Sequence, residues 1–178
     1  NGIPLGDVPQ SATRVDSSLY VVVNNSGRVY KMHARTMDVL GEIQGLNSPR
    51  YFLQVSATKA YVSDLWGEGI SILDLSTMTK EGFVDLGAWI EEMVLLDGFV
   101  YACRRGSSGV LKIDPSTNAV VDSIPTFSGP GSIQVDYLGR VWVLCEGELL
   151  GEQGRIMFID PSNFSVLKEF DLELGTSY

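Results

Sequence analysis

Short runs of apolar residues, separated by Gly, Asp, Asn and Ser, follow one another along the whole chain. Each run is rich in Val, Ile, Leu and aromatic residues, and most are only a few residues long, which is typical of strands. The apolar positions show no helical period. The pattern therefore predicts an all-β protein built from many short antiparallel strands.

One of these runs recurs with an aromatic residue near its centre. It reads SLYVVV, KAYVSD, FVYACR and RVWVLC, and its aromatic residues are Tyr20, Tyr61, Tyr101 and Trp142. These residues are 41, 40 and 41 positions apart. A spacing this regular indicates an internal repeat of about 40 residues, which is the length of a propeller blade.

Three further strands accompany each aromatic strand. The strand before it reads QSATRV, YFLQVS, EMVLLD and SIQVDY, and the strand after it reads RVYKMH, GISILD, GVLKID and RIMFID. A last strand reads DVLGEI, EGFVDL, AVVDSI and SVLKEF. In the fourth unit EGELLGEQG is inserted before the third strand. Four units of four strands, about 41 residues each, predict a β-propeller of four blades.

The turn between the third and fourth strands of each unit has its own signature. Asp114 and Asp160 are each followed by Pro-Ser, Asp74 occupies the same slot in the second unit, and His33 occupies it in the first. An Asp in this slot accepts hydrogen bonds from backbone N–H groups two or three residues on. His33, the only histidine, is therefore predicted to be a turn residue and not a catalytic base.

The repeats fill almost the whole chain as one propeller domain or fragment, residues 1–178. The predicted blades are 9–50, 51–91, 92–131 and 132–174. Three architectures stay open: a closed ring of four blades, a half that pairs with a second copy, and a fragment of a longer chain. The opening NGIPLGDVP resembles a connection between blades and favours the fragment. An open arc exposes two blade flanks, which predicts self-association through them.

Composition narrows the function classes. The net charge is −9, from 22 acidic and 13 basic residues, so the surface repels phosphate backbones and nucleic-acid binding is not expected. No apolar run reaches the ~20 residues of a membrane helix. The first residues lack a signal-peptide pattern, which leaves secretion open because a signal is removed on export. Cys103 and Cys145 are predicted to be free, buried thiols.

Four stretches carry a resemblance to a known family: NGIPLGDVPQS, LYVVVNNSGRVYKM, GLNSPRYF and KAYVSDLW. They resemble the YncE-like, YVTN-type surface propellers of gut-type Gram-negative bacteria, most strongly within residues 1–66. Some of these are similar to lipid-anchored propellers that capture cobalamin for an outer-membrane transporter. The resemblance implies a ring of about seven blades. It also implies a lipoprotein at the cell surface or in the periplasm.

The first strand of a propeller blade lines the central channel, and the loop before it shares a face with the loop between the second and third strands. Polar residues that differ between blades open these inner strands, and aromatic or charged residues lie in loops nearby. The predicted ligand-binding residues are Gln10, Asn47, Arg50, Tyr51, Asp64, Trp66, Trp89, Glu92, Arg104, Arg105, Phe127 and Ser132. Solvation of a water-filled channel and packing between blades are the alternatives. Trp142, in the repeated aromatic slot, is expected in the core.

Few residues in the sequence suggest a catalytic or metal-binding site. Glu91 and Glu92 are neighbours on a strand, so their side chains point to opposite faces and form no carboxylate pair. The glycines of RRGSSG precede no helix that could complete a phosphate site. The inserted loop 146–153 offers carboxylates for calcium without a dedicated calcium-loop pattern. We therefore expect no cofactor and no metal.

Two function classes remain. The first is a non-enzymatic binding module that captures a small molecule, cobalamin-like by resemblance, or docks on an outer-membrane transporter. The second is a lactonase- or lyase-like propeller enzyme whose catalytic residues lie in blades outside this chain. The fold does not choose between them. The lack of a usable base favours the binding module.

Overall fold

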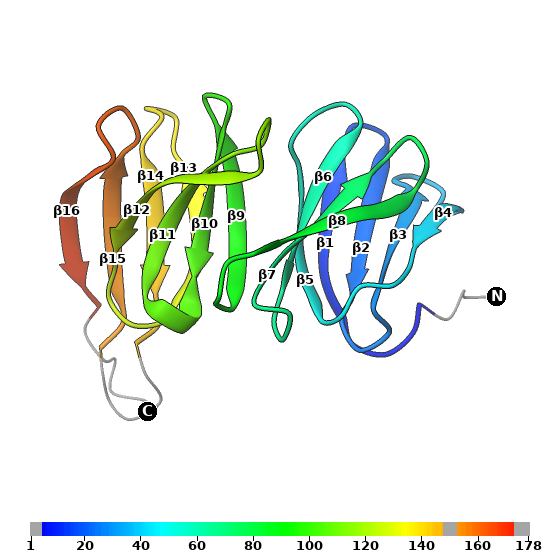
Figure 1. Ribbon diagram of the computed structural model, residues 1–178, viewed down its shortest axis with the longest axis horizontal. Coiled ribbons are helices and arrows are strands. Elements are labelled where there is room, and N and C mark those ends of the chain that lie inside the picture. The colour runs from blue at the N-terminus through cyan, green and yellow to red at the C-terminus, as the bar shows by residue number, and fades with distance from the viewer. Residues whose placement is uncertain (1–4, 148–152, 173–178) are drawn as a thin grey trace. The chain divides into compact units, whose positions relative to one another are not determined.

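The computed structural model describes residues 5–147 and 153–172 (Figure 1). Within these ranges the chain forms four separate sheets, and each sheet has four strands that pair antiparallel in sequence order. The only helical element among the described residues is a single 3-10 turn at Arg105–Ser107, within the predicted hairpin loop. The all-β fold class predicted from the sequence is confirmed.

Each sheet is one blade, numbered from inner to outer strand. Blade 1 contains β1 (Pro9–Val15), β2 (Ser18–Val23), β3 (Arg28–His33) and β4 (Val39–Ile43). Blade 2 contains β5 (Pro49–Gln54), β6 (Lys59–Asp64), β7 (Gly69–Asp74) and β8 (Thr79–Asp85). Blade 3 contains β9 (Ile90–Leu96), β10 (Phe99–Arg104), β11 (Gly109–Asp114) and β12 (Ala119–Pro125). Blade 4 contains β13 (Pro130–Val135), β14 (Val141–Cys145), β15 (Arg155–Asp160) and β16 (Ser165–Asp171).

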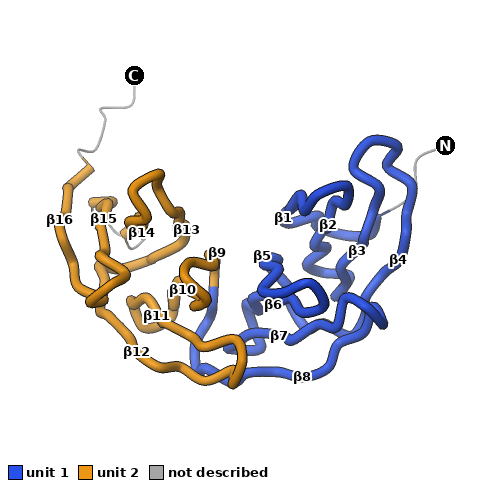
Figure 2. Tube along the Cα trace, turned by 90° about the horizontal axis from the view of Figure 1, so that it is seen from above, with its two compact units in different colours: residues 1–90 blue, residues 91–178 orange. Residues whose placement is uncertain are grey.

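The blades group in pairs into two compact units (Figure 2). Unit 1 spans residues 1–90 and holds blades 1 and 2, and unit 2 spans residues 91–178 and holds blades 3 and 4. No helix in the described part of the chain is long and apolar enough to cross a membrane.

The pattern of each strand follows its place in the blade. The second strand β2 is buried on both faces, so it reads as a nearly continuous apolar run that includes Tyr20 and Val22. The outermost strand β12 is mostly exposed, with exposed fractions of 43% at Val120 and 51% at Val121. Burial is thus greater in the second strand than in the inner strand, and it is low again at the outer edge of the blade.

The core of each unit forms where two blades pack face to face. In unit 1 the Tyr20 ring stacks on Phe52 of blade 2, with ring centroids 4.2 Å apart and planes 9° apart. In unit 2 the Tyr101 ring contacts Phe164 of blade 4 at 5.7 Å. In both units the aromatic residue that recurs in the second strand, which we call the slot aromatic, therefore faces the following blade. This contact explains why the slot recurs at blade spacing.

The two cysteines enter one core cluster in unit 2. Their offsets from the slot aromatic put them on opposite faces of their own sheets, and those are the faces on which blades 3 and 4 meet. Both thiols are free and buried, as predicted. Burial raises the pKa of Cys103 well above its usual value and raises that of Cys145. Both thiols therefore stay protonated and unreactive.

The turns between third and fourth strands form as predicted. Asp114 Oδ1 accepts from Ser116 N at 2.8 Å, and Asp160 Oδ1 accepts from Ser162 N at 2.9 Å. Hydrogen bonds from the serine hydroxyls and backbone N–H groups lower the pKa of both carboxyls. In blade 1 His33 Nδ1 takes the same role and accepts from the backbone N–H of Thr36 at 3.3 Å.

Two expectations about the blade flanks are wrong. Trp142 does not lie in a closed core, because its slot faces the side of blade 4 that no further described blade covers, and its ring is only half-buried. The opposite flank, on blade 1, is not open either. Its apolar side chains are buried with Leu5 packed against them. They are Val21, Val23, Tyr30 and Met32.

Candidate functional site

Inner strands of three blades begin with proline followed by a bulge. Pro9, Pro49 and Pro130 open β1, β5 and β13, and the strand register shifts directly after each of them. Proline has no N–H to donate, so it fits the first residue of an edge strand. A bulge re-aims the side chains that follow it. Three of the four residues predicted to line the channel, Gln10, Arg50 and Ser132, lie at these bulges or next to them.

In unit 1 four of the predicted residues form one cluster. Arg50 Nη1 donates to Gln10 Oε1 at 3.1 Å, which joins the inner strands of blades 1 and 2. The guanidinium carbon of Arg50 lies 5.8 Å from the ring centroids of both Tyr51 and Trp89. Ser11 Oγ also donates to the Arg50 carbonyl at 2.7 Å. The cluster therefore presents a guanidinium between two aromatic rings.

In unit 2 the corresponding link is acidic. Glu92 Oε2 accepts from Ser132 Oγ at 2.6 Å and from Ile133 N at 3.0 Å, and Oε1 accepts from Gln134 Nε2 at 3.3 Å. These three donors are on β13, so the carboxylate joins the inner strands of blades 3 and 4. Its neighbour Glu91 is buried, so the two side chains take opposite faces as expected.

The inner-strand residues thus hydrogen-bond to one another across blades. Packing between blades was an expected alternative for the loop aromatics, whereas ligand contact and solvation of the channel were the alternatives for these polar residues. A signal was available, because Gln10 and Arg50, like Glu92 and Ser132, are 40 residues apart, which is one repeat. Complementary polar residues separated by one repeat indicate a contact between neighbouring blades.

Asp64 shapes the loops beside the unit 1 cluster. Its buried carboxylate accepts from the backbone N–H groups of Ser48, Trp66 and Gly67 at 3.2, 3.1 and 2.6 Å. The Trp66 side chain is 74% exposed. Asn47 is exposed in the loop before β5. Asp64 is therefore a residue that positions the loops, and Trp66 is the most accessible aromatic of the predicted set.

Asn24 was missed by the sequence analysis. Its buried side chain donates from Nδ2 to the Pro49 carbonyl at 2.9 Å and to Ser48 Oγ at 3.1 Å. It therefore fixes the start of β5 from blade 1. Asn24 lies in the loop between β2 and β3, where the sequence differs from blade to blade, so the repeat pattern gave no signal for it.

Arg104 and Arg105 fall at the end of β10 and in the short 3-10 turn. Arg105 Nη2 forms an ion pair with Glu146 Oε2 at 2.8 Å. A Cβ on Gly131 would lie 2.7 Å from Glu146 Oε1 and 3.1 Å from Arg105 Nη1, so a larger residue there would displace the ends of these two side chains. Arg105 thus links the loops of blades 3 and 4.

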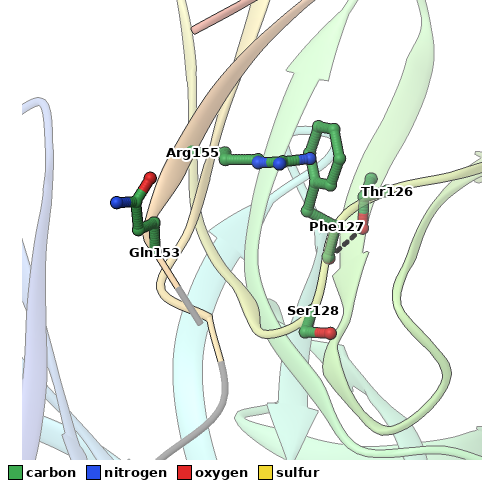
Figure 3. A pocket seen from close by; sticks show the side chains of 5 residues that line it. All are labelled: Thr126, Phe127, Ser128, Gln153 and Arg155. Atoms are coloured by element: carbon green, nitrogen blue, oxygen red, sulfur yellow. Dashed lines mark hydrogen bonds between the residues drawn. The ribbon is translucent and has the colours of Figure 1, made fainter. Parts of the chain in front are cut away.

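A pocket of about 460 Å³ lies on the loops of unit 2 (Figure 3). Its lining residues are Thr126, Phe127, Ser128, Gln153 and Arg155. The guanidinium carbon of Arg155 lies only 3.8 Å from the Phe127 ring centroid, and Figure 3 shows the side chain extended toward the ring. Asp171 Oδ1 on β16 forms an ion pair with Arg155 Nε at 2.6 Å. The pocket thus combines an aromatic ring, a guanidinium, hydroxyls and an amide.

The pocket brings together the two loop types expected to share a face. Residues 126–128 lead into the inner strand β13, and residues 153–155 lead into the third strand β15. We call this side the loop face of unit 2. Phe127 was predicted from the sequence, whereas Gln153 lies in the insertion that only blade 4 carries and Arg155 directly follows it, so both were missed.

The described side chains do not form a cluster of metal ligands. No group of three or more His, Cys, Asp or Glu side chains that could hold a metal occurs among the described residues. The carboxylates of Glu148 and Glu152, considered for calcium, lie outside those residues.

Solved structures similar to this chain are propellers and other β-rich proteins with varied roles. Hydrazine synthase of Kuenenia stuttgartiensis matches with TM-score 0.85 and 19% identity over 92% of this chain and 49% of its own. A protein of unknown function from Bacteroides caccae matches with TM-score 0.77 and 11% identity over 96% and 69%. The WD40 β-propeller domain of Doa1 matches with TM-score 0.75 and 14% identity over 91% and 53%. At these identities the likeness establishes the fold alone.

The chain spans about half the length of the hydrazine synthase chain. Comparison with curated protein sequences finds no match. One family model, described as a domain of unknown function and designated DUF5074, matches residues 1–177. This match includes all the residues that form the four blades, and the chain therefore belongs to the DUF5074 family.

Proposed function

We propose that the chain is a non-enzymatic binding module that captures a small molecule on the loop face of unit 2. The observation that supports this proposal is the pocket in which Arg155 stacks on Phe127. Its volume of about 460 Å³ is within the range of small-molecule sites. A ring and a guanidinium offer contact area, while Ser128, Thr126 and Gln153 offer hydrogen bonds that orient a ligand.

The lining favours a ligand with a flat apolar part and polar or anionic substituents. Aromatic rings contact apolar surfaces, and the guanidinium attracts carboxylate, phosphate or carbonyl oxygens. Cobalamin, the first candidate from the family resemblance, has a flat ring with amide side chains and a phosphate. The second candidate occupant is a loop of an outer-membrane transporter. The same resemblance supports a lipid-anchored location at the cell surface or in the periplasm.

Calorimetry tests the proposal with cyanocobalamin and a panel of glycans. Phe127→Ala should weaken binding by at least about 1 kcal/mol, because truncated aromatic contacts are typical hot spots. Arg155→Lys keeps the charge but loses the planar stack, and should weaken binding as well. The matched control is Phe83→Ala, since Phe83 is an exposed ring beside Lys80 on an outer strand and makes a similar cation–π contact.

The same titrations include Trp66→Ala and Trp89→Ala, which test the residues predicted in unit 1. Weakened binding in these variants, with unchanged binding in Phe127→Ala and Arg155→Lys, would move the site to unit 1. Unchanged affinity in all four variants would remove both faces from the proposal. If no corrinoid or glycan produces heat, docking to a transporter is the remaining form of the proposal.

A further inference from the structure

Both units bury the slot aromatic of one blade against the next blade. Tyr20 of blade 1 is 4% exposed and stacks on Phe52 of blade 2. Tyr101 of blade 3 is 1% exposed, contacts the Phe164 ring of blade 4, and donates from its hydroxyl to the Pro161 carbonyl at 3.5 Å. The same slot therefore makes an apolar contact between blades in each unit.

Trp142 is the slot aromatic of blade 4, and the strand register shows which residues share its face. Residues directly opposite each other on neighbouring strands lie on one side of a sheet. Two rows across β13 to β16 result. One row is Gln134, Trp142, Phe158 and Lys168, and the other is Ser132, Leu144, Ile156 and Phe170. We call these eight residues the Trp142 face.

The Trp142 face is apolar at its centre and open to solvent. Trp142 and Phe158 lie 3.8 Å apart between ring centroids, and Phe158 and Phe170 lie 5.3 Å apart. Leu144 is 37% exposed and Phe170 is 39% exposed. A cavity of about 350 Å³ lies over Trp142, Leu144 and Ile156. Large apolar side chains gathered in this way indicate a contact surface.

The charge of the Trp142 face also differs from that of the rest of the chain. The chain carries a net charge of −9, yet none of the eight residues is acidic. The carboxylates next to this face are already paired: Asp136 is held by Arg140 Nη2 at 2.7 Å and by Trp142 Nε1 at 2.9 Å, and Glu92 accepts from Ser132 Oγ at 2.6 Å. An apolar partner can therefore pack here without burying an unpaired charge.

The flank of blade 1 offers no equivalent surface. Val23 is fully buried there, and Tyr30 and Met32 are each 7% exposed, with Leu5 packed against this cluster. A second copy joining head to tail would have to displace that packing. The partner of the Trp142 face must therefore bring an apolar sheet face of its own.

We propose that the Trp142 face is the contact surface for a further four-stranded blade, carried by a longer form of the same polypeptide. That blade places an apolar inner-strand side chain on the Trp142 ring, as Phe52 does on Tyr20. The contact continues an interface that each unit already contains. It also agrees with the solved Doa1 propeller, of which this chain covers 53%.

The test compares the 178-residue chain with the product of its reading frame that includes the next repeat. In the 178-residue chain Trp66→Phe and Trp89→Phe leave Trp142 as the only tryptophan, and in the longer protein any tryptophan outside residues 1–178 is replaced by phenylalanine as well. Trp142 emission should shift to shorter wavelength in the longer protein, and quenching by acrylamide should fall severalfold. In the native background, Trp142→Ala should lower the melting temperature of the longer protein more than that of the shorter one.

The control is Trp66→Ala, which should shift both melting temperatures equally because the exposed Trp66 side chain is in unit 1. A reading frame without a further repeat would overturn the proposal. So would a longer protein in which Trp142 stays as accessible to acrylamide as in the shorter one. Light scattering measures whether the longer protein is a dimer. A dimer that the Trp142→Asp variant dissociates would show that a second copy covers the Trp142 face, and this would also overturn the proposal.

Discussion

Unit 1 and unit 2 use the same inner-strand region for opposite chemistry. In unit 1 the Arg50 guanidinium joins neighbouring blades and lies against two rings, whereas in unit 2 the Glu92 carboxylate joins neighbouring blades through three donors on one strand. Arg50 directly follows the proline that opens β5, whereas Glu92 is on β9, which opens at Ile90, and binds β13, which opens with Pro130 and a bulge. The comparison shows that the scaffold fixes where a polar link forms and leaves its charge open.

The two links also differ in what they require of the partner blade. The Glu92 carboxylate satisfies a backbone N–H at Ile133, so its loss leaves a donor without its acceptor. Arg50 donates to a side-chain amide and contacts ring faces, which can rearrange or meet water. We therefore expect unit 2 to depend more on its link than unit 1 does.

The largest effect is expected at Glu92. Glu92→Ala should lower the free energy of unfolding by about 1–3 kcal/mol, because a backbone donor and a hydroxyl lose their partner. Glu92→Gln keeps an acceptor oxygen and should lose less. Urea unfolding of both variants measures the difference. Equal losses in the two variants would mean that the hydrogen bonds do not carry the link.

A smaller effect is expected at Arg50. Arg50→Ala should cost about 1 kcal/mol, because it removes the hydrogen bond to Gln10 and the cation–π contacts with Tyr51 and Trp89. Arg50→Lys retains the charge without the planar group and should recover only part of this loss. Measured by the same urea unfolding, a loss at Arg50 larger than that at Glu92 would reverse the comparison between the units.

The turns before the second strands of blades 4 and 2 should contribute differently to stability as the pH changes. Burial raises the pKa of Asp136, but hydrogen bonds from Trp142, Arg140 and Leu138 outweigh it and hold the pKa well below its usual value. Blade 2 uses the neutral hydroxyl of Ser56 in its turn. A carboxyl with a lowered folded-state pKa stabilises the protein above its unfolded pKa, and this contribution is lost as pH falls below about 4.

Asp136→Asn should therefore be less stable than the wild type at neutral pH, and the gap should close between about pH 5 and pH 2. Thermal unfolding followed by circular dichroism across this range measures it. Ser56→Ala is the matched variant in unit 1, and its loss should not change with pH. A gap for Asp136→Asn that stays constant down to the lowest pH would refute the assignment.

The smallest effects are expected in the turns between third and fourth strands. Asp114→Ala and Asp160→Ala each remove short hydrogen bonds at exposed turns, so each should lower the melting temperature by only a few degrees. Neither should change ligand affinity, because these turns are not among the loops that line the pocket. A loss of binding at unchanged melting temperature would place the binding site on the turns.

The repeat made most of the fold predictable from the sequence. The slot aromatics at 40 or 41 residues gave the four sheets, and the Asp-Pro-Ser turns gave the hairpins that close them. Periodic features of this kind report local structure and the contact with a neighbouring blade. The half-buried state of Trp142 was missed because a repeat pattern does not say which blade lacks a neighbour.

The candidate site was predictable only in part. Arg50, Tyr51 and Trp89 were named from the sequence and do lie together, but their contacts with one another and with Gln10 were not foreseen. Arg155 gave no signal, because it follows an insertion that the other blades lack. Residues outside the repeat obtain their positions from packing between blades, which local patterns do not encode.

The most direct test of the account is a map of backbone amide chemical shifts during titration with cyanocobalamin. The account predicts shifts concentrated in residues 126–128 and 153–155 of unit 2, with little change around Arg50 or in the turns at Asp114 and Asp160. Phe127→Ala should reduce these shifts without unfolding the protein. Shifts confined to unit 1 or to the turns would contradict the claim that the loop face of unit 2 binds the ligand.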